Sequence, residues 1–92
     1  MLIFLVAGML SNLGNLELAV GNVGAALKYY DRALPVWINS NEESVQSLAK
    51  TYLSMGRAYM YQGNLAEALK YTDSAEALVA RTMGMGFRFM AK

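Results

Sequence analysis

A chain of 92 residues is long enough for one folded domain and too short for two. Its residues are 55% hydrophobic and 16% charged, against roughly a quarter charged in an ordinary soluble domain, so some apolar surface is expected to stay uncovered. The net charge of +1, with acids and bases mixed, argues against nucleic acid as a partner. Cysteine and histidine are both absent, which excludes disulfides and thiolate or imidazole metal ligands.

The chain opens on the apolar run MLIFLVAGML, which raises the question of a membrane segment. This run covers about half of the roughly 20 residues that cross a bilayer, and Ser11, Asn12 and Asn15 interrupt the apolar pattern after it. No basic residue precedes the run, as one would in a secretory signal. We therefore expect a buried helix, no membrane span and a cytoplasmic location.

Two helices are predicted before residue 39. The first has apolar residues at steps of three or four, at Val6, Leu10, Leu13, Leu16 and Val20. After Gly21 and Asn22 a second stretch has helical spacing, at Val23, Ala26, Leu27, Tyr30 and Ala33. Pro35 in the second stretch removes an amide donor. We expect the helix either to kink there or to end near Leu34, with residues 36–38 packing as a short continuation.

A second pair of helices is predicted after the segment NSNEES, residues 39–44. Ser40 followed by Glu43 is a capping-box pattern that starts a helix, with apolar residues at Leu48, Tyr52, Met55 and Tyr59. Gly63 suits the left-handed conformation that ends a helix, and Asn64 with Glu67 is expected to cap the next. The apolar spacing of this fourth helix is at Leu65, Ala68, Leu69, Thr72 and Ala75.

The two helix pairs are copies of one unit. Residues 21–33 read GNVGAALKYYDRA and residues 63–75 read GNLAEALKYTDSA, which is a spacing of 42 residues. The same spacing aligns Gly14 with Gly56. A period of this length, without the alternation of strands, predicts a solenoid in which each unit buries its apolar face against its neighbours.

The repeated unit resembles the tetratricopeptide repeat. In the second unit the matching residues are Tyr52, Met55, Gly56, Tyr59, Gly63, Ala68 and Ala75. The first unit has Glu17 where an aromatic residue is usual. The period is longer than the usual 34 residues and is similar to that of kinesin light chains and of bacterial regulators of the MalT type. The resemblance implies an all-α fold of antiparallel helix-turn-helix repeats, stacked as a short right-handed α-solenoid.

We predict one such domain over residues 1–92. Repeat one covers about 1–38 and repeat two about 42–82. A shift by the period sets FRFMAK, residues 87–92, beside VQSLAK, residues 45–50. Residues from about 84 to 92 are therefore expected to begin the first helix of a third repeat.

The resemblance implies a module that binds a peptide or partner protein in a concave groove lined by the first helices. The family's groove positions fall on Ser11, Asn12, Asn15, Leu18, Lys50, Leu53, Ser54, Arg57, Met60 and Tyr61. Of these, the residues most expected to contact a partner are Asn12, Asn15, Lys50, Ser54, Arg57 and Tyr61. The clamp that holds acidic chaperone tails in some family members is mostly missing, because Ser11 and Ser54 replace its Lys and Asn.

An alternative function is homo-oligomerisation through exposed apolar ends. The residues expected at these ends are Ile3, Val6, Phe87 and Met90. Catalysis is not expected, because Asp31 and Asp73 sit one turn from Lys28 and Lys70, where surface pairing explains them. No glycine-rich phosphate loop is present either. We predict no cofactor and no metal.

Overall fold

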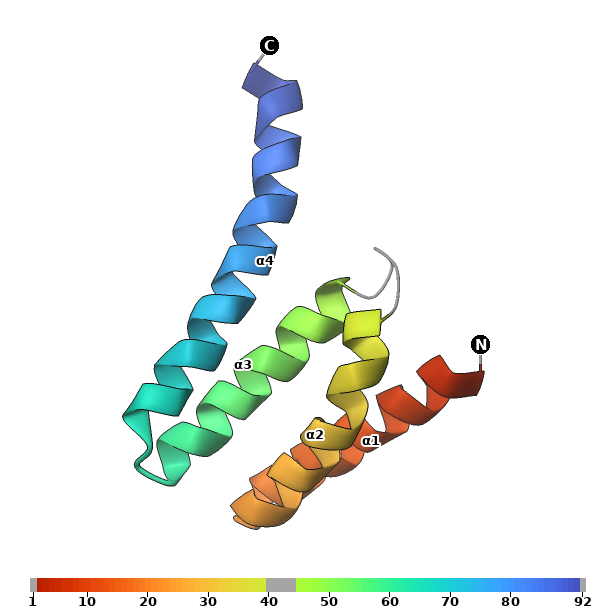
Figure 1. Cartoon of the computed structure of the whole chain (residues 1–92), viewed down its shortest axis with the longest axis vertical. Helices are drawn as coiled ribbons and strands as arrows, with labels where there is room; N and C mark the ends of the chain where they lie inside the picture. Colours follow the sequence, from red (N-terminus) through yellow and green to blue (C-terminus); the bar gives the residue numbers. More distant parts are fainter. Residues whose placement is uncertain (1, 40–44, 92) are drawn as a thin grey trace.

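The computed structural model describes residues 2–39 and 45–91, with side chains described as far as Arg81. It contains four helices, α1 (Leu2–Ala19), α2 (Val23–Asn39), α3 (Val45–Tyr61) and α4 (Leu65–Ala91) (Figure 1). No strand occurs in the described ranges. The predicted fold class, an all-α helical repeat of about two units, is confirmed.

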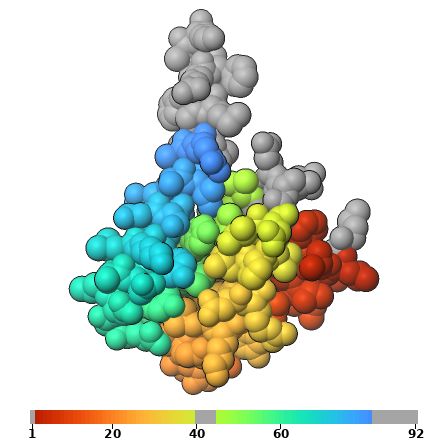
Figure 2. All heavy atoms as spheres, in the orientation of Figure 1, coloured from red at the N-terminus to blue at the C-terminus, as the bar shows by residue number. Residues whose placement is uncertain are grey.

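Each repeat is an antiparallel helix pair. α1 packs along α2, α3 packs along α4, and α2 joins the two pairs by packing on α3. The four helices therefore follow one another across the molecule in chain order. Figure 2 shows the result on one face, where α1 lies at one edge and α4 at the other.

The two corners have the same backbone geometry, as the repeated Gly-Asn predicts. Gly21 has φ of 89° and Gly63 has φ of 79°, which is the left-handed region that glycine adopts without a steric cost. At the second corner the amide of Asn64 donates to the Tyr59 carbonyl at 2.9 Å and that of Gly63 donates to the Met60 carbonyl at 2.9 Å. These two bonds satisfy carbonyls that the end of α3 would otherwise leave unpaired.

The first corner repeats the backbone bonds but uses its asparagine differently. The amide of Asn22 donates to the Glu17 carbonyl at 2.8 Å and that of Gly21 to the Leu18 carbonyl at 3.1 Å. The Asn22 side chain donates through Nδ2 to Oε1 of Glu17 at 3.2 Å. Asn64, by contrast, caps α4 as predicted, because its Oδ1 accepts from the Glu67 amide at 3.3 Å.

The core lies between the helices in two clusters. The larger cluster comprises Leu18, Ala26, Leu27, Tyr30, Met55 and Ala58, and it joins the two repeats. The smaller comprises Ala7, Leu10, Ala33 and Trp37, between α1 and α2. Trp37 also stacks on Phe4, with ring centroids 6.2 Å apart and planes within 2°. Tyr30 and Met55 are the largest fully buried side chains among the described residues.

Two helix boundaries need comment. Of the two alternatives left open at Pro35, a kink or an early end near Leu34, the early end is excluded, because α2 passes through Pro35 and ends at Asn39. Burial of Trp37 in the smaller cluster holds the turns beyond the proline, and Figure 1 shows α2 changing direction in its second half. α4 is continuous to Ala91 where a third helix was expected to begin near residue 84, because no Gly-Asn corner interrupts it.

The largest difference concerns α1. Only one stripe of it is buried, formed by Ala7, Leu10, Gly14 and Leu18 against α2. The expectation of a buried helix is therefore wrong for its outer face. By length and composition α1 is also apolar enough to cross a membrane, although 22% of this window is buried in the fold. The mostly buried core helix of a soluble protein and a signal sequence near an N-terminus pass the same test, so the absence of a membrane span stays a prediction.

Candidate functional site

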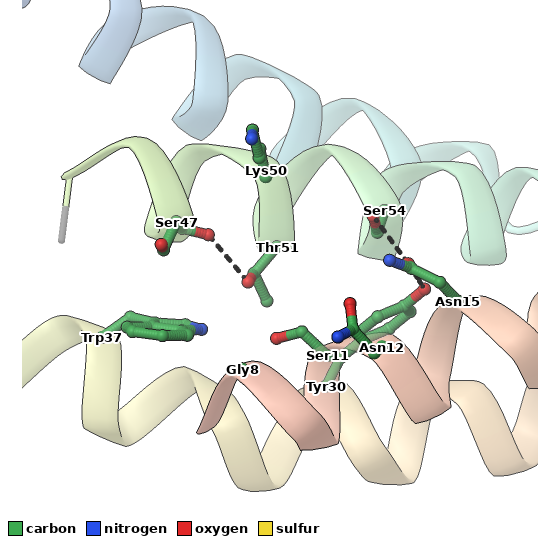
Figure 3. Close-up of a pocket in the computed structure, with 10 residues that line it drawn as sticks. All are labelled: Gly8, Ser11, Asn12, Asn15, Tyr30, Trp37, Ser47, Lys50, Thr51 and Ser54. Carbon is green, nitrogen blue, oxygen red and sulfur yellow. Dashed lines mark hydrogen bonds between the residues drawn. The ribbon is translucent and has the colours of Figure 1, made fainter. Parts of the chain in front are cut away.

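A polar groove runs between the first helices of the two repeats. It holds a cavity of about 220 Å³, with α1 on one side, α3 on the other and two aromatic side chains of α2 at its base (Figure 3). The lining residues are Gly8, Ser11, Asn12, Asn15, Tyr30, Trp37, Ser47, Lys50, Thr51 and Ser54. Most of them carry a hydroxyl, amide or ammonium group, which is unusual for a contact between packed helices.

Asn15 is fixed by two hydroxyl groups from different helices. Its Oδ1 accepts from the Tyr30 hydroxyl at 2.5 Å and from the Ser54 hydroxyl at 3.4 Å. Because the amide oxygen is engaged in this way, the amide nitrogen is left to donate elsewhere. Figure 3 shows Nδ2 of Asn15 directed along the groove. The cost in helix propensity of an asparagine inside α1 is thus offset by these contacts.

Tyr30 connects the groove to the core. Its ring is fully buried, and its hydroxyl reaches Asn15 in the groove. Burial raises the pKa of the Tyr30 phenol, while the Ser54 hydroxyl and the charge of Arg57 lower it in part. Tyr30 therefore stays a neutral donor at physiological pH.

The groove presents donors rather than acids. Lys50 is the only charged residue among the ten described residues that line it. Oγ of Ser11 is buried and has no hydrogen-bond partner within the described part of the chain, and Figure 3 shows it pointing into the space between α1 and α3. Amide nitrogens in the cavity and the exposed Lys50 at its α3 edge, whose nitrogen end Figure 3 shows directed away from α1, suit a ligand rich in hydrogen-bond acceptors.

Four of the six predicted contact residues line this cavity, namely Asn12, Asn15, Lys50 and Ser54. Arg57 and Tyr61 lie further along α3 and are exposed without lining it. Leu18, one of the family's groove positions, does not face the groove. It is buried in the larger core cluster, because α2 covers that side of α1.

Sequence reasoning missed five lining residues, of which Ser47 and Thr51 were within its reach. Both lie one turn from Lys50 or Ser54 on α3 and so share a helix face with them. Tyr30 and Trp37 come from α2, and only the packing of α1 on α2 brings them to the groove. Gly8 lines the cavity through its backbone, which leaves no side-chain pattern to detect.

The structure describes the side chains of two of the four residues predicted at the apolar ends. Both Ile3 and Val6 are exposed, Val6 on the outer face of α1 and Ile3 one turn before Ala7, in line with the core stripe. Phe87 and Met90 belong to the stretch of α4 whose side chains lie outside the described residues. Among the described residues no group of three or more acidic side chains is placed to hold a metal ion.

A comparison of the sequence with models of known protein families identifies the family of this chain. The family model described as tetratricopeptide repeat matches residues 5–83, which is most of the chain and includes both corners. The chain belongs to the tetratricopeptide repeat family. Repeats of this family generally mediate protein–protein interactions and are typically non-enzymatic scaffolds. No curated protein and no solved structure matched the chain.

Proposed function

We propose that this tetratricopeptide repeat chain binds a peptide segment of a partner protein in the groove between α1 and α3. The observation that carries the proposal is the cavity lined by donors from both first helices, with Lys50 as its charged residue. Single repeats have no such surface, because the groove needs α1 and α3 together. The family supplies the general role of protein binding.

The chemistry of the groove favours an extended segment with a nearby carboxylate. Because Oδ1 of Asn15 accepts from the Tyr30 hydroxyl, its Nδ2 remains to donate to a backbone carbonyl of the peptide. The ammonium group of Lys50 supplies a charge-assisted bond to an acidic side chain or a terminal carboxylate. Asn12, exposed beside them, adds a further amide donor.

A peptide library displayed on phage, selected against the whole chain, tests this proposal. Enriched sequences are titrated against the chain, and fluorescence of Trp37 reports occupancy because it lines the cavity and is the chain's single tryptophan. The variant Lys50→Glu should weaken binding by at least about tenfold, since it replaces the cation with a repelling charge.

Lys28→Glu is the matched control, because it makes the same charge change on an exposed part of α2 that does not line the groove. It should leave binding within about twofold. Peptides that bind equally well to Lys50→Glu, or that leave the Trp37 emission unchanged, would place the binding site elsewhere and refute the proposal.

Self-association is a second candidate function. It is favoured by one observation, the exposed apolar outer face of α1, which includes Val6. A soluble monomer rarely exposes an apolar patch of such length without a partner.

A further inference from the structure

The outer face of α1 carries one continuous apolar stripe that the other described helices leave uncovered. Its side chains are 40–78% exposed, and they are Leu2, Val6, Met9, Leu13, Leu16 and Val20. Val20 extends the helix, because its amide donates to the Leu16 carbonyl at 3.2 Å. The steps of four, three, four, three and four residues are those of a seam between two packed helices.

Three residues of α3 that correspond to this stripe in the second repeat are buried. One period later, Met9, Leu13 and Leu16 correspond to Thr51, Met55 and Ala58 of α3, and all three of these are buried. Met55 and Ala58 pack in the core cluster with residues of α2. The stripe on α1 is therefore the face by which a first helix packs on a neighbouring helix.

We propose that this stripe pairs with the same stripe of a second copy of the chain, antiparallel about a two-fold axis. The inference rests on self-association, the second candidate function, and is independent of the groove. The spacing of the stripe is palindromic about position 11. An axis there sets Leu2 against Val20, Val6 against Leu16 and Met9 against Leu13 of the other copy, so all six positions are matched.

An antiparallel pair fits better than a parallel one. Each antiparallel layer combines a larger with a smaller or flexible side chain, such as Leu16 with Val6 or Leu13 with Met9, so the layers have similar volumes. A parallel pair in register would set Val6 on Val6 and Val20 on Val20, which leaves two narrow layers among four wide ones. Antiparallel helix dipoles also attract, whereas parallel dipoles repel.

The other occupants fit less well. α4 of another copy could stack head to tail, since Leu65 and Leu69 correspond to Val23 and Leu27 of α2. However, Leu34, which packs on the larger core cluster, is replaced by Glu76 on α4, and this carboxylate would lie against the apolar stripe. A lipid surface is disfavoured because helices that lie on membranes are rich in cations, and Lys28 is the first cation of the chain.

The area of the stripe suits a dimer. Six large side chains of this exposure, widened by Leu5 at one end, bury on the order of 600 Å² per chain, which is about 1,200 Å² in total. Specific interfaces begin at about this size. Because the stripe carries no charge, its pairing should not depend on salt.

Size-exclusion chromatography with light scattering on the whole chain tests the pairing. At about 100 µM we expect twice the chain mass, unchanged between low and high salt. Leu16→Glu should raise the dissociation constant at least about tenfold, because it places a charge in the seam of both copies. The matched control is Leu65→Glu on α4, since Leu16 is 65% exposed and Leu65 is 63% exposed. It should leave the dimer intact.

Disulfide trapping then fixes the direction of the pairing, because the chain has no cysteine of its own. In the antiparallel pair a cysteine at position 6 lies about 15 Å along the axis from its copy, which is too far to bond. It faces position 16 instead. An equimolar mixture of Val6→Cys and Leu16→Cys should therefore form the mixed dimer, while neither variant alone should cross-link.

Each result has a separate meaning. A monomeric wild-type chain refutes self-association and with it this inference. A dimer that survives Leu16→Glu refutes pairing through α1 but not self-association. Loss of the dimer in both Leu16→Glu and Leu65→Glu indicates head-to-tail stacking, and cross-linking of Val6→Cys alone indicates a parallel pair. Recovery of the monomeric chain on phosphatidylcholine vesicles would show that lipid covers the stripe.

Discussion

Gly14 on α1 lies against the ring of Tyr30 on α2, and its replacement by alanine is the sharpest test of the packing. A Cβ at this position would lie 2.6 Å from Cε1 and 2.9 Å from Cδ1 of Tyr30, where ordinary contacts are 3.4–4 Å. The ring cannot turn away. It is fully buried, and its hydroxyl is held by Asn15 at 2.5 Å.

The expected size of the effect comes from two opposed terms. Replacing glycine by alanine inside a helix stabilises it by about 1 kcal/mol. Overpacking a closed core costs about 1–3 kcal/mol, and the rigid ring puts Gly14→Ala at the upper end of this range. Gly8→Ala, in the same helix, isolates the gain in helix propensity, because a Cβ at position 8 would meet nothing within 4 Å. Gly14→Ala should therefore be about 2–3 kcal/mol less stable than Gly8→Ala.

Urea unfolding followed by circular dichroism at 222 nm measures both variants beside the wild type. In a thermal scan the same difference should separate their midpoints by roughly 10 °C or more. Gly8→Ala should match or exceed the wild type. If Gly14→Ala were as stable as Gly8→Ala, the close packing of α1 on the Tyr30 ring would be wrong, and so would the position of Asn15 in the groove.

Two further predictions concern Tyr30 and the corners. Tyr30→Phe should lower the free energy of unfolding by about 1 kcal/mol at pH 8, because Asn15 loses a donor. Because burial raises the pKa of Tyr30 above 10.0, the unfolded phenol ionises first, so the wild type should lose stability as the pH rises beyond about 10. In urea titrations at pH 8 and 10.5, Tyr30→Phe should lose less unfolding free energy between the two pH values than the wild type does. An equal loss in the two proteins would contradict the burial of Tyr30. Asn64→Ala should cost about 1 kcal/mol through the lost cap on Glu67, whereas Asn22→Ala, which breaks one exposed side-chain contact, should cost at most about half as much.

The sequence alone predicted the corners and the helix order because these depend on local chemistry. A glycine at positive φ followed by an asparagine ends one helix and starts the next wherever it stands, so Gly21 and Gly63 marked both corners correctly. Pro35 was harder to interpret. The cost of a proline in a helix is local, but the burial of Trp37 that offsets it depends on α1, and no local rule contains that contact.

Helix periodicity was enough to predict the groove residues that lie on the two first helices, α1 and α3. Asn12 and Asn15 on α1, and Lys50 and Ser54 on α3, share faces that the repeat pattern sets toward the concave side. The base of the groove comes from α2 and depends on how closely α1 and α2 approach. The outer face of α1 was misjudged for a related reason, because apolar residues predict burial but do not say which neighbour provides it.

α1 has three faces with different tasks, and this accounts for its unusual composition. With 3.6 residues per turn, its core stripe, its groove residues and its apolar stripe lie about 120° apart around the helix. Two of these three faces are apolar. The helix is therefore nearly uncharged, although only one of its faces is buried in the core. Because the groove and the stripe do not share residues, antiparallel pairing would leave both grooves of a dimer accessible. A partner with two copies of a binding segment would then gain avidity that the monomeric Leu16→Glu variant lacks, while its affinity for a single segment would be unchanged.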